Sequence, residues 1–163
     1  MTSPEIDRSH QSPNHSSRRG HDVECIVLHS TEGAFDSAVA WLCNPDSGVS
    51  SHYVIAKDGR IAELVSPLEK AWHAGVSYFR GETNVNAFSI GIEMEHFDGQ
   101  EKWPDEQVAA CSLLCAWLCY TFKLPDGRIT SHAAIARPKG RKVDPQDFPW
   151  ESFSEHFVNA IGD

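Results

Sequence analysis

The amino-acid sequence predicts a single α/β domain with about three helices around its strands. Segments with the apolar pattern of short strands alternate with segments of helical periodicity, and no internal repeat or linker divides the chain. A length of 163 residues is enough to bury one hydrophobic core. We place the ordered domain at residues 21–163, after a polar, loosely ordered lead-in over residues 1–20.

Four segments predict strands. Residues 24–29 are apolar and rich in β-branched side chains, which is typical of a short buried strand. Residues 52–56 and 61–65 flank the turn sequence Lys-Asp-Gly-Arg, and Asp-Gly between two β-rich segments indicates a hairpin. Residues 88–95 alternate, and one face of this strand carries the larger apolar side chains Ile90, Ile92 and Met94.

Three segments predict helices. A short helix is expected over residues 37–43, with Ser37 as its N-cap. The longest helix is expected over residues 104–123, where spacings of three and four place one apolar stripe toward the core: Val108, Cys111, Cys115, Leu118 and Phe122. A final short helix should hold Phe153 and Phe157. Cysteines spaced by four within a helix indicate packed thiols rather than a disulfide framework, which favours a reducing compartment.

The composition limits the possible partners and the location. A formal charge of −9 argues against nucleic acid and anionic membranes as partners. No apolar run approaches the roughly 20 residues that cross a bilayer, and the polar first 20 residues contain no apolar core of a secretory signal. We therefore expect a cytoplasmic protein, or one that leaves the cell by a route that its own sequence does not encode.

Two histidines and one aspartate could form a metal site. His29 ends a predicted strand, His132 follows the strand-like residues 129–131, and Asp144 lies twelve positions later. Two imidazoles and one carboxylate with an open fourth position are typical of a hydrolytic zinc site. The spacing alone does not select these three, because buried or surface histidines and an aspartate that caps a turn would give the same pattern. From the pattern alone, this second interpretation is slightly favoured.

Two further residues could act beside such a site. Glu93 shares a strand face with the small residues Ser89 and Gly91, so it could border a cleft and serve as a general base. Lys142 lies two residues before Asp144, close enough to stabilise a developing oxyanion. Taken alone, each is more simply an ordinary surface residue.

Six ordered segments, taken together, resemble the type-2 N-acetylmuramoyl-L-alanine amidases, the relatives of the peptidoglycan recognition proteins. The resemblance extends from about residue 12 to the C-terminus, and AWHAGVS and SIGIE are its most specific motifs. The segments that carry it are IVLHST at 26–31, VSSHYVI with KDG at 49–59, AWHAGVS at 71–77, NAFSIGIE at 86–93, SH at 131–132 and KVDP at 142–145.

This resemblance implies a central mixed β-sheet flanked by helices, with a zinc site in a surface cleft. It implies Zn²⁺ as the cofactor, with His29, His132 and Asp144 as ligands, and Glu93 and Lys142 as catalytic residues. We expect substrate contacts from residues in two of the matching motifs: Trp72, His73 and Asn86. The implied reaction cleaves the amide between N-acetylmuramic acid and L-alanine, so residues 21–163 would be an amidase domain that acts as a monomer.

Two alternatives remain open at this point. One is a module of the same fold that binds peptidoglycan or muropeptides without cutting them; the complete ligand set and Glu93 argue against it. The other keeps the chemistry but changes the biological role, to a phage lysin (an endolysin) that a holin releases to the cell wall. The sequence leaves open whether the substrate is the intact wall or a soluble muropeptide from wall recycling.

Overall fold

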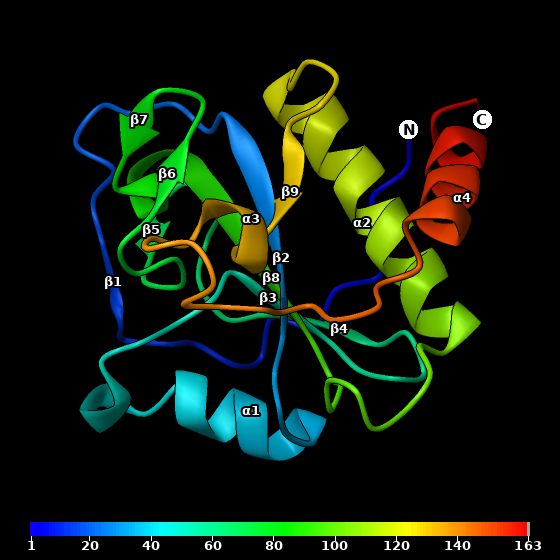
Figure 1. The fold of residues 1–163 in the computed structure, drawn as a ribbon, viewed down its shortest axis with the longest axis horizontal. Coiled ribbons are helices and arrows are strands. Elements are labelled where there is room, and N and C mark those ends of the chain that lie inside the picture. Colours follow the sequence, from blue (N-terminus) through cyan, green and yellow to red (C-terminus); the bar gives the residue numbers. More distant parts are fainter. Residues whose placement is uncertain (163) are drawn as a thin grey trace.

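A five-stranded mixed sheet forms the centre of the molecule in a computed structural model, which describes residues 1–162 (Figure 1). The strand order is β4-β3-β8-β2-β9, and only the β3–β4 pair is antiparallel. The bounds of the strands are β2 Cys25–Ser30, β3 Tyr53–Ile55, β4 Ile61–Glu63, β8 Ser89–Met94 and β9 Ile129–Ser131. The expected mixed sheet in a single α/β domain is therefore confirmed.

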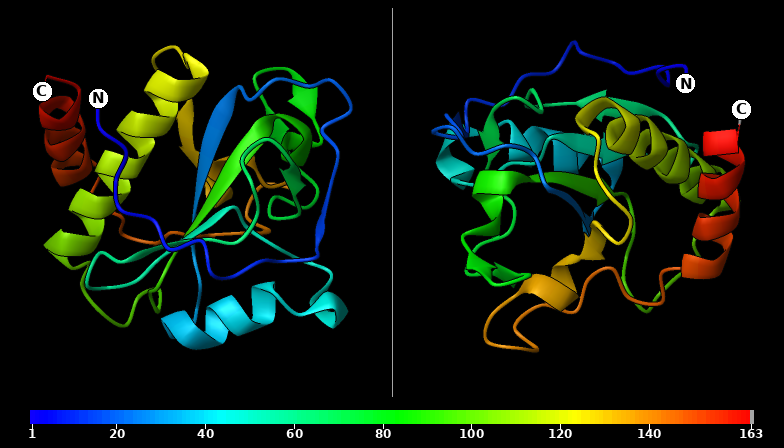
Figure 2. Two further views of the ribbon diagram at one scale, coloured as in Figure 1. Left: turned by 180° about the vertical axis from the view of Figure 1, so that it is seen from behind. Right: turned by 90° about the horizontal axis from the view of Figure 1, so that it is seen from above.

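Four α-helices surround the sheet. On one side lie α2 (Asp105–Phe122) and α4 (Trp150–Gly162), packed beside each other; on the other lie α1 (Phe35–Leu42) and the single-turn α3 (His132–Ile135) (Figures 1 and 2). Within residues 1–162, none of the helices combines the length and the apolar character needed to span a bilayer.

The two faces of the sheet have different compositions. The face toward α2 and α4 is apolar and continuous, with Ile26, Leu28, Ile90, Ile92 and Met94 packed against the buried stripe of α2. On the opposite face, β2 and β8 carry smaller or polar side chains such as Cys25, Val27, Ser89 and Gly91. His29, His52 and His73 lie on this second face. All five cysteines are free thiols, so the expectation of packed thiols is confirmed.

Several local predictions need correction. The first helix begins at Phe35 and its N-cap is Ala34, because the Ser37 hydroxyl lies inside the first turn and donates to the Ala34 carbonyl instead of capping. The last helix is longer than expected, at 13 residues. The sequence patterns also missed α3 and the shortest elements: β1 His15–Ser16, β5 Lys70–Ala71, β6 Tyr78–Phe79, β7 Glu82–Thr83 and the 3₁₀ turns Pro45–Ser47 and Val85–Phe88.

Part of the N-terminal segment packs onto the domain. Ser12, Asn14 and Arg18 are buried, and β1 pairs with β5. Asn14 donates to the Asn44 and Val49 carbonyls at 2.8 Å each, and Arg18 donates to backbone carbonyls that include Ala87 and Ser89. Residues 12–18 thus make ordered contacts with the domain, while the proposed domain boundary at residue 20 stays a prediction.

Candidate active site

The register of the parallel strands brings three of the predicted residues together. His29 in β2 lies directly beside Glu93 in β8, and Leu28 pairs with Ser131 in β9. His132 follows Ser131, so it reaches the same edge of the sheet from the other neighbouring strand. The carboxyl ends of adjacent parallel strands are where open α/β sheets place their ligand sites.

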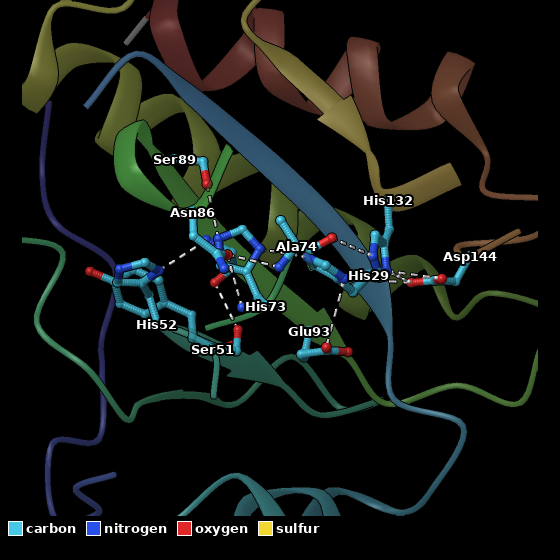
Figure 3. Close-up of polar contacts among 12 residues, drawn as sticks. His29, Ser51, His52, His73, Ala74, Asn86, Ser89, Glu93, His132 and Asp144 are labelled. Carbon is cyan, nitrogen blue, oxygen red and sulfur yellow. Dashed lines mark hydrogen bonds and ion pairs between the residues drawn. The ribbon is translucent and has the colours of Figure 1, made fainter. Parts of the chain in front are cut away.

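Asp144 arrives on the loop between α3 and α4. Its carbonyl oxygen accepts the Ala133 amide at 2.9 Å, which ties the loop to the start of α3. The carboxylate lies 3.5 Å from His29 Nδ1 and 3.2 Å from His132 Nδ1. One donor atom from each of His29, His132 and Asp144 lies within 4.8 Å of the others (Figure 3). The structure thus brings these three predicted ligands into one possible metal site.

The hydrogen bonds of His132 support a cation between these groups. His132 Nε2 lies 3.3 Å from the Ala74 carbonyl, which can only accept, so this nitrogen carries the proton. In the tautomer with its only proton on Nε2, His132 presents a lone pair at Nδ1 to the Asp144 carboxylate at 3.2 Å. Two acceptors that face each other at this distance are stabilised by a positive ion between them. Two imidazoles and one carboxylate fit zinc in number and in kind.

The electrostatics of the site separate the two carboxylates. Burial lowers the pKa of His29 to about 4, against the opposing effect of the Asp144 carboxylate, so this imidazole is neutral. Burial alone would raise the pKa of Asp144, but the adjacent His132 and His29 side chains hold it well below its usual range. Burial and then the nearby Asp144 charge raise the pKa of Glu93 well above its usual range. The site therefore combines an ionised carboxylate with a carboxyl group that can hold a proton.

These residues border a cleft of about 620 Å³. Glu93 points into the site with Oε1 at 3.8 Å from His29 Nδ1, and its buried Oε2 has no hydrogen-bond partner within the described chain. Lys142 is exposed on the cleft wall, and its positive charge lowers the pKa of both Glu93 and His29. The structure therefore assembles His29, His132, Asp144, Glu93 and Lys142 around one cleft.

The three predicted substrate contacts lie in different environments. Trp72 lines the cleft and donates from Nε1 to Ser16 Oγ at 3.2 Å. His73 also lines the cleft, although both of its ring nitrogens are within hydrogen-bond distance of protein groups. Asn86 accepts the His73 and Ala74 amides at 3.0 and 2.8 Å and is not among the residues lining this cleft in residues 1–162. Their roles in binding stay predictions.

The sequence patterns missed several cleft residues. Trp41 projects from α1 and is 56% exposed although it borders the cleft. Asp98 and Arg141 lie on loops, where no periodicity marks the direction of a side chain. A tryptophan on a predicted helix outside its apolar stripe is the one signal that could have indicated Trp41.

The sequence of this chain is similar to those of known amidases. The N-acetylmuramoyl-L-alanine amidase family profile matches residues 19–147. The N-acetylmuramoyl-L-alanine amidase AmiD of Escherichia coli (strain K12) is 34% identical over 157 positions, covering 86% of this chain and 55% of AmiD. The 1,6-anhydro-N-acetylmuramyl-L-alanine amidase AmpD of Haemophilus influenzae is 39% identical over 107 positions, covering 64% of this chain and 56% of AmpD. The chain thus spans little more than half the length of these relatives.

Solved structures show the same fold. A crystal structure of a selenomethionine AmpD derivative superposes with a TM-score of 0.83 at 27% identity, covering 96% of this chain and 99% of the other. Escherichia coli AmiD in complex with anhydro-N-acetylmuramic acid-L-Ala-D-γ-Glu-L-Lys superposes with a TM-score of 0.75 at 31% identity, covering 91% and 61%. Since the family match covers most of the sequence and takes in His29, Glu93, His132 and Asp144, the chain belongs to the N-acetylmuramoyl-L-alanine amidase family.

Proposed function

We propose that this chain hydrolyses the amide between N-acetylmuramic acid and L-alanine in soluble anhydromuropeptides, with zinc held by His29, His132 and Asp144. The observation that carries the proposal is the arrangement of these three donors beside Glu93, a residue of the cleft whose buried Oε2 has no hydrogen-bond partner within residues 1–162. Membership of the amidase family supports the same reaction. One chain supplies every group at the site, which is consistent with a monomeric enzyme.

Each residue has a distinct task in the proposed reaction. Zinc held by His29, His132 and Asp144 would supply Lewis acidity for the amide carbonyl and for an attacking water. Glu93 takes a proton from that water and delivers it to the alanine nitrogen as the C–N bond breaks. Lys142 stabilises the negative charge that develops on the carbonyl oxygen. The products are a lactyl carboxylate on the sugar and a peptide with a free amino terminus.

Soluble fragments fit the surface and the relatives better than the intact wall does. AmpD is named for a 1,6-anhydro substrate, and AmiD was solved with an anhydromuropeptide. A formal charge of −9 opposes binding to a wall that carries anionic polymers. The exposed indole of Trp41 and the half-buried Trp72 offer an apolar wall for a sugar ring in the same cleft.

The test compares two substrates, a 1,6-anhydromuropeptide and purified intact sacculi, each with and without a zinc chelator. Products are identified by mass spectrometry, and His132→Ala serves as the variant that lacks one ligand. We expect chelator-sensitive release of a peptide beginning with L-alanine, faster from the anhydromuropeptide. Faster release from sacculi would favour a lysin, and a zinc-loaded protein that binds but cuts neither substrate would indicate a binding module.

A further inference from the structure

The His73 ring lies directly behind the predicted zinc ligand His29. Its Nδ1 is 3.0 Å from His29 Nε2, and its Nε2 is 2.9 Å from Ser89 Oγ (Figure 3). The two rings meet edge to face, with centroids 5.1 Å apart. His29 Nδ1 faces Asp144, so Nε2 is the nitrogen on the far side of the ring from the other donors.

The strand beneath this ring has a glycine where any side chain would clash. A Cβ at Gly91 would lie 2.5 Å from His73 Cγ, well inside contact distance. The Gly91 backbone is held on both sides, since its amide donates to His52 Nδ1 at 3.0 Å and its carbonyl accepts Ser51 Oγ at 2.8 Å. Asn86 holds the His73 amide at 3.0 Å. The fold thus fixes the position of the His73 ring from below and along its backbone.

The positions of the protons follow from the partners. A His29 ring that offers its Nδ1 lone pair to a metal carries its only proton on Nε2. His73 Nδ1 then accepts this N–H, so the single proton of a neutral His73 ring is on Nε2, where it donates to Ser89 Oγ.

We propose that His73 is a positioning residue that holds the predicted zinc ligand His29 in its metal-binding tautomer and orientation, with Ser89 in turn orienting His73. The proposal rests on the zinc site of the proposed function. Metal-ligating histidines usually donate their second N–H to a carboxylate, a carbonyl or water. Here the acceptor is the neutral imidazole of His73, which orients the His29 ring without adding charge to the site. A hydrogen bond between substrate and the His73 ring would need a free nitrogen, and both nitrogens are engaged.

Zinc affinity of the metal-free protein tests the proposal. The variants are His73→Leu, His73→Asn, Ser89→Ala and the control Ser112→Ala, which removes an equally buried serine hydroxyl from α2, where it bonds to Val108 and Phe153 carbonyls. We expect His73→Leu to bind zinc roughly 10–100-fold more weakly, the range for lost outer partners of metal ligands. His73→Asn restores an acceptor near Nδ1 and should recover much of this loss. Ser89→Ala should weaken zinc binding, and Ser112→Ala should not.

Two results would overturn the positioning role. One is equal zinc affinity for wild type and His73→Leu while wild type binds zinc normally; a wild type that binds no zinc would instead remove the proposed zinc site itself. The other comes from ¹⁵N NMR of the zinc-loaded wild type, which needs no variant to fold. We expect the His73 proton on Nε2 and an unprotonated Nδ1, and a proton on Nδ1 contradicts the proposal.

Discussion

At the residue scale, Glu93 shows how burial beside an open cleft changes the proton affinity of a carboxylate. A buried carboxylate without a hydrogen-bond partner is costly, yet Glu93 Oε2 has none within the described residues. The same burial, with the charge of Asp144 nearby, raises its pKa and so favours uptake of a proton. These features fit the proposed role of Glu93 as a base rather than as another metal ligand.

The substitution Glu93→Gln should therefore remove turnover and leave zinc binding intact. The amide keeps the shape of the side chain but cannot take a proton, and loss of a general base costs roughly 10²–10⁴-fold in rate. Turnover of an anhydromuropeptide and zinc content are measured on the same preparation. The matched control is Glu95→Gln. Glu95 follows the same strand but lies away from the cleft, where its carboxylate accepts the Lys57 amide at a distance of 2.9 Å. A near wild-type rate for Glu93→Gln would exclude Glu93 as the base.

The residues of the site differ in how far the sequence could predict them. His29 ends one recognisable strand and His132 follows another, and the motifs around them supplied the predicted ligand set that the structure brings together. Spacing alone could not pair them, because the contact depends on the register of β2 with β9. Arg141 and Asp98 lie on loops, where side-chain direction depends on tertiary contacts such as the bond from the Gln146 amide to Asp98 at 3.1 Å.

At the element scale, β8 is the strand on which both the core and the site depend. Its Ile90, Ile92 and Met94 pack toward α2, while Ser89, Gly91 and Glu93 face the histidines. The alternating pattern predicted this division. The pattern did not show why position 91 is a glycine, because the ring that occupies its space comes from the distant AWHAG segment.

Replacing Gly91 by Ala should destabilise the fold and disturb the site together. The added Cβ would lie 2.5 Å from His73 Cγ, and overpacking of this kind costs roughly 1–3 kcal/mol. Urea unfolding and zinc affinity report the two effects. Gly33→Ala is the control, since a Cβ there would meet its nearest neighbour at an ordinary 3.7 Å. Unchanged stability and affinity in Gly91→Ala would show that the ring moves aside freely.

The longer elements were predictable and the single-turn ones were not. The helix at 105–122 has enough turns for its periodicity to appear, and the 53–63 hairpin has its Asp-Gly turn. By contrast, α3 has four residues and is fixed by contacts, with the Ser131 hydroxyl accepting the Ala134 amide and the Asp144 carbonyl accepting the Ala133 amide. Contacts of this kind depend on the tertiary fold and leave no pattern in a short sequence window.

At the scale of the whole molecule, the sheet face opposite α2 and α4 carries a group of buried polar side chains, most of them neutral. His29, His52 and His73 all have pKa values lowered by burial. Arg18 Nη2 lies 3.2 Å from His52 Nε2, and the guanidinium donates to the Pro67, Ala87 and Ser89 carbonyls. Burial lowers the pKa of Arg18 to about 10. The hydrogen bonds among these groups hold the histidine rings in fixed positions. Because the histidines must stay neutral, the stability of the fold depends on pH.

His52 shows the sign of this dependence most clearly. Its Nδ1 accepts the Gly91 amide at 3.0 Å and its Nε2 donates to the Glu69 carbonyl at 2.9 Å, so the folded ring is neutral; burial lowers its pKa to about 3. In an unfolded chain the pKa of histidine is about 6.5. Between these values the unfolded chain binds more protons than the native one. The stability that His52 contributes is therefore complete above the unfolded pKa and is lost as the pH falls toward the folded pKa.

We expect the free energy of unfolding of the metal-free protein to fall with acidification, and His52 to account for roughly 1.4 kcal/mol per pH unit of that slope well below pH 6.5. His52→Asn keeps an acceptor for the Gly91 amide but cannot titrate, so its slope should be shallower by that amount. Urea unfolding at several pH values between neutrality and about pH 4.5 measures both slopes, with exposed His21→Asn as the control that matches wild type. Parallel slopes for wild type and His52→Asn would mean that His52 is not held neutral by the fold.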